Sequence, residues 1–438
     1  MKWRTLRARS TSFVYESYGW KVQGEDLVMS FHFRLASRKG PDIHFRPEVR
    51  LKHIDRRRLE KLPAQFLSNL VFHLGLAEMP SYWKAAISPE ILISCASLYT
   101  GQIRFWEDLF WKGLAEFSFT NKITLPKREF VKIKSTVPQP LRAPGADVGP
   151  LRLQLARSFS GVLIPLGGGK DSIVTLERMK KRKRRIGALV LNPGPAHQRI
   201  MRIASVKYKM FAERTLDSKL LALNRRGYLN GHTPFSAYLS FLAVLAAVLG
   251  GWRQVAMSQE SSADEANLIW RGRGINHQYS KSSEFERKFR EYLKAYLVEG
   301  LQYSSALRHL SELEIAKLFS RYPQYFSAFR SCNRGLKEDR WCEHCPKCLF
   351  SFLILYPWLS EDDRKKIFKK NLLDEPVLLP LAKRFLGIYG FKPFECVGAR
   401  KEIKEAFCLG IKKAGREKES LPYILEKLKP MISCEKLI

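Results

Sequence analysis

Hydrophobic and polar positions alternate over much of the N-terminal part of the chain. Apolar side chains occupy every second position from Leu27 to Phe33. Alternation with a period of two is typical of a strand that buries one face. We therefore predict antiparallel strands over residues 12–50, with a turn at residues 24–26.

Residues 58–118 have a helical pattern instead. An aromatic-rich segment within it contains Phe105, Trp106, Phe110 and Trp111. Large rings at helical spacing bury much apolar surface, so we expect this segment to form part of a core and not to contact a cofactor.

A third pattern begins after a stretch rich in proline and glycine at 138–150, which indicates a linker. Short apolar runs at 162–166, 187–192 and 254–258 then alternate with helical patterns. Such alternation predicts α/β order around a parallel sheet. From residue 331 onward, the chain carries a cysteine cluster followed by helical segments.

A glycine loop follows the first of these apolar runs. Residues 161–175 read GVLIPLGGGKDSIVT, so three glycines stand between an expected strand and an expected helix. Glycines let the backbone approach a ligand, and a helix start offers free N–H groups to an anion. The alternative is a glycine turn inside an α/β core that binds no ligand.

Two common phosphate loops do not fit this segment. The Walker pattern fails because Ile164 stands at its first glycine and Asp171 follows the lysine. The dinucleotide pattern fails because Ser172 stands at its last glycine. What remains resembles the pyrophosphate loop, SGGxDS, of the ATP-pyrophosphatase (PP-loop, adenine nucleotide α-hydrolase-like) family, with Gly167 in place of the first serine.

That resemblance implies a nucleotide-binding loop and a reaction. The family cleaves ATP between its α and β phosphates, so that a substrate oxygen becomes adenylated. The residues that would hold ATP and Mg²⁺ are Gly167, Gly168, Gly169, Lys170, Asp171 and Ser172. Ligands of parallel sheets bind at the carboxyl ends of strands. We therefore expect the loop, residues 192–194 and residues 258–260 to meet at one cleft.

The predicted organisation has four parts. They are an N-terminal α+β domain (1–134), a linker (135–158), a PP-loop nucleotide-binding α/β domain (159–330) and a four-cysteine knuckle with a helical C-terminal region (331–438).

Four clustered cysteines predict a metal site. Cys332, Cys342, Cys345 and Cys348 have the spacing C-x9-C-x2-C-x2-C. Four thiolates suit a tetrahedral structural zinc ion, although iron fits the same pattern. His344, inside the knuckle, is an alternative ligand. Redox-active thiols and four unrelated buried cysteines are the other interpretations.

The other four cysteines are Cys95, Cys396, Cys408 and Cys434, which we interpret as structural or free thiols. Clustering of half of the cysteines favours a reducing compartment with a metal site over a disulfide framework.

Charge is the one unusual feature of the composition. The 438 residues include 76 Lys and Arg against 42 Asp and Glu, a formal net charge of +34. Such a field attracts polyanions, so nucleic-acid binding is one interpretation. A generally basic proteome is the other, because the cations are spread along the chain. The densest run, Lys180–Arg185, is expected at a helix C-terminus, where cations are favourable.

Two features bear on cellular location. The first ten residues carry charges and lack an apolar signal core, so we expect no export. The apolar run at 235–251 is at the lower limit for spanning a bilayer and contains small and hydroxyl residues. A buried helix is the better interpretation, and we expect no membrane insertion and a cytoplasmic location.

The loop and the late cysteine knuckle together resemble the 7-cyano-7-deazaguanine synthases, which adenylate a carboxylate. Four further stretches resemble the UDP-N-acetyl-α-D-muramoyl-L-alanyl-L-glutamate epimerase (MurL) family instead, and this resemblance spans most of the chain. The stretches are residues 113–117 (GLAEF), 230–235 (NGHTPF), 276–282 (NHQYSKS) and 392–398 (KPFECVG).

The MurL resemblance implies ATP-dependent inversion of the terminal L-glutamate of UDP-MurNAc-L-Ala-L-Glu for peptidoglycan synthesis. A ligase that adds L-glutamate would act before it as a functional partner. The alternative is a PP-loop enzyme that modifies RNA or a 7-deazaguanine carboxylate, which the high charge favours.

Candidate roles follow from this chemistry. Lys170 and Ser172 would contact phosphates, and Asp171 would hold Mg²⁺, which prefers oxygen ligands. Glu260, just past a strand, is a candidate base or metal ligand, or simply a helix cap.

Four further positions carry basic side chains. His277 titrates near neutrality and is a candidate acid or base, or a satisfied buried histidine, with Lys281 as an anion clamp. Lys392 and Arg271 are candidates for binding the substrate diphosphate.

Overall fold

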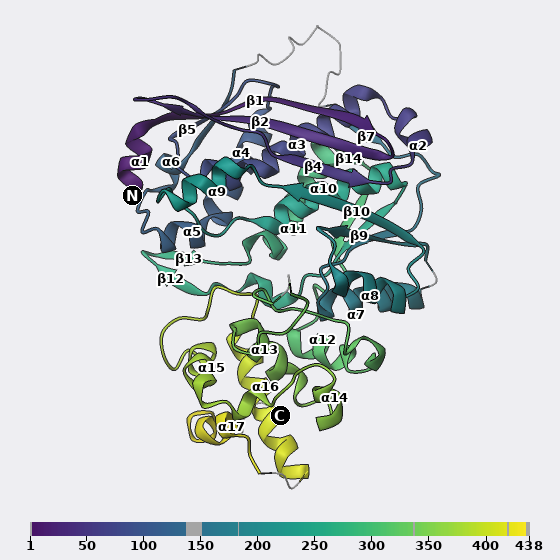
Figure 1. Ribbon diagram of the computed structural model, residues 1–438, viewed down its shortest axis with the longest axis vertical. Coiled ribbons are helices and arrows are strands. Elements are labelled where there is room, and N and C mark those ends of the chain that lie inside the picture. The colour runs from purple at the N-terminus through teal and green to yellow at the C-terminus, as the bar shows by residue number, and fades with distance from the viewer. Residues whose placement is uncertain (1, 137–150, 183, 336–337, 418–419, 435–438) are drawn as a thin grey trace.

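The computed structural model describes residues 2–136, 151–182, 184–335, 338–417 and 420–434. Most of the predicted linker, residues 137–150, lies outside these ranges. Within them the dominant element is one eleven-stranded mixed sheet, flanked by helices (Figure 1).

The strands of the large sheet are β1 (Ser10–Gln23), β2 (Asp26–Ser37), β3 (Ile43–Phe45), β4 (Glu48–Lys52), β5 (Glu90–Ile93), β6 (Lys132–Ser135), β8 (Val162–Pro165), β9 (Ile186–Leu191), β10 (Tyr208–Thr215), β11 (Gln254–Met257) and β15 (Gln302–Ser305). Two small sheets pair β7 (Leu153–Gln154) with β14 (Val298–Glu299), and β12 (Leu268–Trp270) with β13 (Arg273–Ile275).

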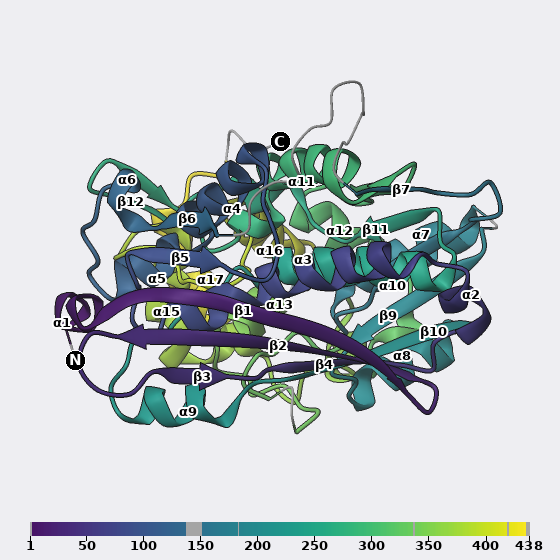
Figure 2. The same cartoon turned by 90° about the horizontal axis from the view of Figure 1, so that it is seen from above.

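The strand order is β15-β11-β8-β9-β10-β4-β2-β1-β5-β6, with β3 on β2. Pairing is parallel from β15 to β10, antiparallel from β10 through β4 and β2 to β1, and parallel again from β1 to β6. Figure 2 shows the long β1 and β2 side by side. The sheet is continuous, because β4, before the linker, pairs with β10, after it.

The α-helices of the described residues are α1 (Trp3–Arg9), α2 (Arg56–Glu60), α3 (Ala64–Trp83), α4 (Thr100–Gly113), α5 (Ala115–Thr120), α6 (Lys127–Phe130), α7 (Lys170–Lys181), α8 (Pro195–Ile203), α9 (Ser218–Arg225), α10 (Phe235–Gly250), α11 (Ser283–Tyr296), α12 (Glu312–Phe319), α13 (Pro346–Leu355), α14 (Glu361–Lys365), α15 (Leu379–Leu386), α16 (Arg400–Glu417) and α17 (Tyr423–Leu428). Helices α13 to α17 gather at the end of the molecule opposite β1 and β2 (Figure 1).

Two hydrophobic cores lie on the two faces of the parallel strands. In β8, Leu163 belongs to the core that contains α3, α4 and α10. Its neighbours Val162 and Ile164 belong to the core that contains α7, α12 and α13. Successive side chains of a strand point to opposite faces, so a fully buried strand needs a continuous apolar run. This explains the short apolar runs of the sequence.

The predicted antiparallel strands over residues 12–50 are confirmed, with the chain turning between β1 and β2. The helical prediction for 58–118 missed β5, whose backbone pairs with β1 and β6. That short strand depends on partners distant in sequence. The aromatic segment is part of the core, since Trp106 and Phe110 are fully buried.

The α/β pattern is confirmed at β8, β9 and β11. Strands β10 and β15 were not predicted. In β10, the sequence YKMFAERT mixes charged and apolar residues because only part of the strand is buried. Its pairing with β9 and β4 therefore fixes it more than its own pattern does.

The apolar run at 235–251 forms α10, which is almost wholly buried between the sheet and α3. Among the described residues, no helix combines the length and the apolar character needed to cross a membrane.

Cys408 and Cys434 form a disulfide, so they are not the thiols that we expected.

The basic run begins at the end of α7, as predicted, and two of its side chains contact other residues of the protein. The Arg185 guanidinium lies 3.7 Å from the ring centroid of Trp252. Arg184 donates to Gln254.

Candidate active site

The glycine loop connects β8 to α7 and is held by the chain that precedes Cys332. Gly168 has a φ of +79°, a conformation that favours glycine. Its carbonyl accepts a hydrogen bond from the Arg330 N–H at 2.9 Å. A Cβ on Gly169 would lie 2.8 Å from Ser331 Oγ, so no side chain fits there without a shift. A Cβ on Gly167 would meet open space.

A cleft of about 220 Å³ opens at this loop. Residues that line it include Gly167, Asp171, Ser258, Gln259 and Lys281. The predicted meeting of the glycine loop with the end of β11 is therefore confirmed.

The third predicted segment, residues 192–194, is not among the described residues that line the cleft. His197, in the first turn of α8, lies beside the glycine loop instead. Its Nδ1 accepts from the Gly194 N–H, and its ring is 3.4 Å from the Cβ position of Gly168.

The cleft has polar atoms available for a ligand. Ser258 Oγ is buried and has no hydrogen-bond partner among the described residues. The start of α7 directs backbone N–H groups to the loop, where an anion is favoured. Ser172 Oγ bonds to the Gly169 carbonyl and lies at the cleft wall. These features suit a phosphate.

Lys170 faces a group of carboxylates next to the cleft. Its Nζ lies 2.5 Å from Asp171 Oδ1 and also bonds to Glu312. Burial alone would lower the pKa of Lys170, but the charges of Asp171 and Glu312 raise it above its usual range. Lys170 is absent from the described residues that line the cleft, whereas Asp171 is present.

Two buried carboxylates, those of Glu312 and Glu260, belong to the same group. Ser311 caps α12 in a capping box with Glu314, which places Glu312 at the first helical position. Burial raises the pKa of Glu312, and the negative charges of Asp171 and Glu260 add to that effect. Glu260, 2% exposed, lies after β11, at the N-cap of the 3-10 helix Ser261–Asp264. The oxygens of Asp171, the carboxylate that reaches the cleft, are of the type that Mg²⁺ takes.

His277 lies in a second cluster with Glu116 and His232. Its Nδ1 bonds to Glu116 Oε2, and His232 Nδ1 lies 3.5 Å from the same oxygen. Burial alone would lower the pKa of His277, but hydrogen bonds with Cys396 and Glu116 raise it to about 9.

Lys281 connects this cluster to the cleft. Its Nζ lies 3.2 Å from Cys396 Sγ, while the residue also lines the cleft. Burial alone would raise the pKa of the Cys396 thiol, but Lys281 and the hydrogen bond with His277 lower it to about 6. Sequence reasoning missed Cys396 as a site residue.

A polar scaffold fixes these loops relative to one another. The Asn267 side chain accepts from the His277 N–H at 3.0 Å and donates to the Pro393 carbonyl at 2.9 Å. Lys392, 1% exposed, bonds to Glu265 at 2.8 Å and to the Gly398 carbonyl. Lys392 is therefore engaged within the protein, and Arg271 lies exposed in the turn between β12 and β13.

All four stretches that resemble the MurL family meet at this cluster. Glu116 comes from the first, His232 from the second, His277 and Lys281 from the third, and Cys396 from the fourth. The signal available in the sequence for Cys396 was the stretch KPFECVG, in which Cys396 is the reactive side chain.

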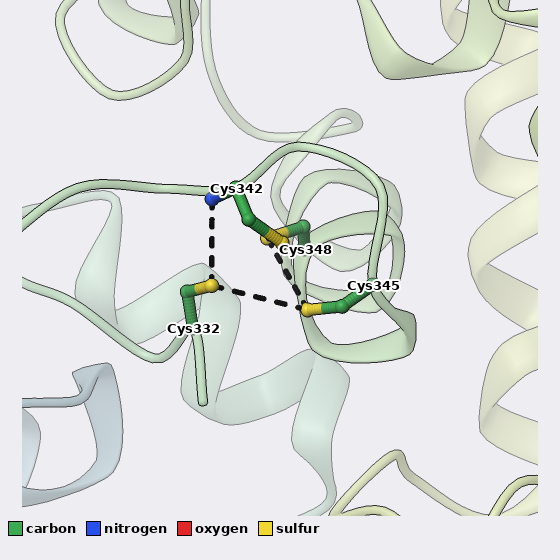
Figure 3. A group of neighbouring side chains, drawn as sticks. All are labelled: Cys332, Cys342, Cys345 and Cys348. Atoms are coloured by element: carbon green, nitrogen blue, oxygen red, sulfur yellow. Dashed lines mark hydrogen bonds between the residues drawn. The ribbon is translucent and has the colours of Figure 1, made fainter. Parts of the chain in front are cut away.

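The four clustered cysteines come together as predicted (Figure 3). Their Sγ atoms are 3.9 Å apart for Cys332–Cys345, 3.7 Å for Cys342–Cys348 and 3.5 Å for Cys345–Cys348. Bonds of about 2.3 Å to a tetrahedral metal give an edge of about 3.8 Å. The cluster could therefore hold a metal ion.

Backbone groups support the same arrangement. The N–H groups of Gly335 and Cys342 approach Cys332 Sγ at 3.1 and 3.4 Å, which stabilises a thiolate. His344 turns away from the sulfurs, since its Nδ1 bonds to the Cys342 carbonyl. Cys332 also lines the cleft, so the cluster is part of its wall.

Fold and site define a class of protein: a mixed-sheet α/β protein with a glycine loop at a cleft next to a four-cysteine cluster. The family model for the MurL N-terminal domain matches residues 4–306, and that for the MurL C-terminal domain matches residues 328–433. The chain belongs to the MurL family.

Curated relatives agree with this assignment. A UDP-N-acetyl-alpha-D-muramoyl-L-alanyl-L-glutamate epimerase of Salinispora tropica is 38% identical over 335 residues, covering 75% of this chain and 70% of the relative. Proteins of the same name from a Micromonospora species and from Xanthomonas oryzae pv. oryzae are 36% and 34% identical over 75% of this chain, covering 72% and 71% of their own lengths.

Proposed function

We propose that this protein inverts the terminal L-glutamate of UDP-MurNAc-L-Ala-L-Glu to D-glutamate, at the expense of ATP, in peptidoglycan precursor synthesis. The observation that carries the proposal is the match to epimerases of that name over 75% of the chain. The two MurL family models span the residues that line the cleft. A ligase that adds L-glutamate would supply the substrate, and we expect the reaction in the cytoplasm.

The need for ATP follows from the acidity of the α-proton. A carboxylate next to the α-carbon makes its C–H bond a very weak acid. Conversion to an acyl-adenylate, with release of pyrophosphate, removes the negative charge and makes the carbonyl electron-withdrawing. A side-chain base can then remove the proton.

The residues of the cleft suit the adenylation step. The loop backbone at Gly167–Gly169 and the Ser172 hydroxyl would bind the phosphates, and Asp171 would hold Mg²⁺, which neutralises phosphate charge. Lys170, beside Asp171 and Glu312, keeps that carboxylate in place. Lys281, which also lines the cleft, would bind the substrate carboxylate.

The four-cysteine centre would hold a structural zinc ion. All four sulfurs would serve as ligands, which leaves no coordination position for substrate. Its function is to fix the residues from Arg330 to Asn333 against the glycine loop.

The direct assay combines purified protein, ATP, Mg²⁺ and UDP-MurNAc-L-Ala-L-Glu. We expect AMP and pyrophosphate, a product of unchanged mass, and D-glutamate on chiral analysis after hydrolysis. ADP as product, or an absolute requirement for RNA or ammonia, would contradict the proposal and favour the RNA-modification or deazaguanine alternative.

A further inference from the structure

Cys396, which contacts the cleft residue Lys281, is a nucleophile that the adenylation step leaves without a task. Its side chain is half-buried and lies between two cationic groups, the Lys281 ammonium and the His277 imidazole. Glu116 bonds to Nδ1 of His277. Lys347 adds a more distant positive charge.

This environment favours the thiolate form of the sulfur. A buried thiol without partners would keep its proton, because burial penalises the charged form. Here an ammonium 3.2 Å away and a protonated imidazole stabilise the negative charge. These contacts therefore favour a thiolate at Cys396 beside the imidazolium of His277.

The position of Cys396 would keep its sulfur apart from the phosphates of ATP but within reach of the substrate. Lys281 lines the cleft together with Asp171 and Ser172, and the same residue contacts Cys396. Cys396 itself is not among the described residues that line the cleft. A glutamyl carboxyl group activated at the loop and held by Lys281 would therefore direct its α-carbon, one bond further, toward the sulfur.

We propose that Cys396 Sγ is the catalytic base that removes the α-proton of the activated glutamyl residue, with His277 and Lys281 as positioning residues that keep it a thiolate. This rests on the proposed function.

The Cα–H bond breaks, its proton forms an S–H bond with Cys396, and its electron pair moves into the carbonyl of the acyl-adenylate. A proton from water then reaches the opposite face of the planar α-carbon. Water then attacks the carbonyl of the acyl-adenylate, the acyl C–O bond to phosphate breaks, and AMP leaves. The proton on the thiol neutralises the hydroxide left by the first water, which restores the thiolate.

The test uses Cys396→Ser in the full-length protein, with Cys95→Ser as the matched control. Cys95 is also a half-buried free cysteine, but it lies after β5. For Cys396→Ser we expect ATP–pyrophosphate exchange close to that of the wild type, while inversion and α-deuterium incorporation fall by about 10²–10⁴-fold, the usual contribution of a general base. Cys95→Ser should retain both activities.

A second measurement does not depend on turnover or on the fold of a variant. Iodoacetamide at neutral pH should alkylate Cys396 of the wild type faster than Cys95, whose pKa burial raises to about 12. Substrate with ATP should protect Cys396. Slow labelling of Cys396, or labelling that substrate leaves unchanged, would overturn the assignment.

The possible failures are distinguishable. Normal inversion by Cys396→Ser overturns the role of Cys396 alone. A glutamyl thioester on Cys396 in acid-quenched wild type would make it a nucleophile, and a second metal ion held by Glu116, His232 and His277 would make the cluster a metal site; either result overturns the proposal. Absence of both exchange and inversion in the wild type overturns the proposed function as well.

Discussion

Single charges decide how the site is arranged. Lys170 and Lys281 both have acidic partners. Lys170 binds the carboxylates of Asp171 and Glu312 beside the cleft. Lys281 lines the cleft and contacts the sulfur of Cys396. A pattern of residue types cannot separate these two lysines, because the difference depends on which buried groups each one meets. Site residues that are neighbours in the sequence, such as those of the glycine loop, can be predicted. The contacts of Cys396 with Lys281 and His277 can be recognised only in the fold.

At Asp171, replacement by asparagine should abolish most ATP–pyrophosphate exchange while the fold persists. The change removes one negative charge at the phosphates and no core volume, and Lys170 retains Glu312 as a partner. We expect a loss of about 10²–10³-fold, typical of one electrostatic group at a reacting centre. Exchange kinetics and the melting temperature measure the two effects, and unchanged exchange would show that Asp171 is not in the nucleotide site.

At Cys396, inversion should depend on pH in the acidic range. The groups that face its sulfur are Lys281, His277 and Lys347, with Glu116 behind His277. Because the pKa of Cys396 is about 6, α-deuterium incorporation should fall as pH decreases through about 6.

His277→Gln provides the matching test of cause. Removal of the imidazolium takes away a group that lowers the pKa of Cys396, so the acidic limb should move to higher pH. ATP–pyrophosphate exchange serves as the control, since it does not use the thiolate. An acidic limb that stays in place would show that His277 does not act on the sulfur.

At the scale of elements, short segments place the site. The cysteine knuckle holds the glycine loop through the hydrogen bond from Arg330 N–H to the Gly168 carbonyl. Spacing within one segment predicted the knuckle, the loop and strands β8, β9 and β11. It could not predict β5, β10 or β15, whose stability comes from strands far away in sequence.

Metal removal should therefore affect both stability and nucleotide binding. Chelation, or Cys345→Ser, should lower the melting temperature, because binding by four thiolates contributes folding free energy. Weaker ATP binding should accompany the change, since Arg330 and Ser331 lose their fixed position beside the loop. Elemental analysis should find one zinc ion per chain. Protein without metal, yet with an unchanged melting temperature, would contradict the structural role.

At the scale of the whole molecule, the segments before and after the linker form one unit. Besides the β4–β10 pairing, Arg214 on β10 makes a two-pronged salt bridge with Glu78 on α3. The Glu78 side chain is fully buried, and that of Arg214 is 14% exposed. The sequence predicted separate patterns on either side of the linker, but the pairing between them depends on the complete fold.

Arg214→Ala should destabilise the protein by about 3–5 kcal/mol, because it leaves the Glu78 carboxylate buried without its partner. Arg57→Ala, at an exposed position in α2, is the control and should stay within about 0.5 kcal/mol. Denaturant unfolding measures both variants. Equal stability of the two would show that the salt bridge does not join the two segments.

The most direct test of the central claim is the reaction in heavy water with ATP, Mg²⁺ and UDP-MurNAc-L-Ala-L-Glu. If adenylation serves to acidify the α-proton, each inverted glutamate carries one deuterium at its α-carbon, each inversion releases AMP and pyrophosphate, and L-alanine keeps its configuration because its carboxyl group is in a peptide bond. Inversion without α-deuterium, or inversion without ATP consumption, would contradict the account.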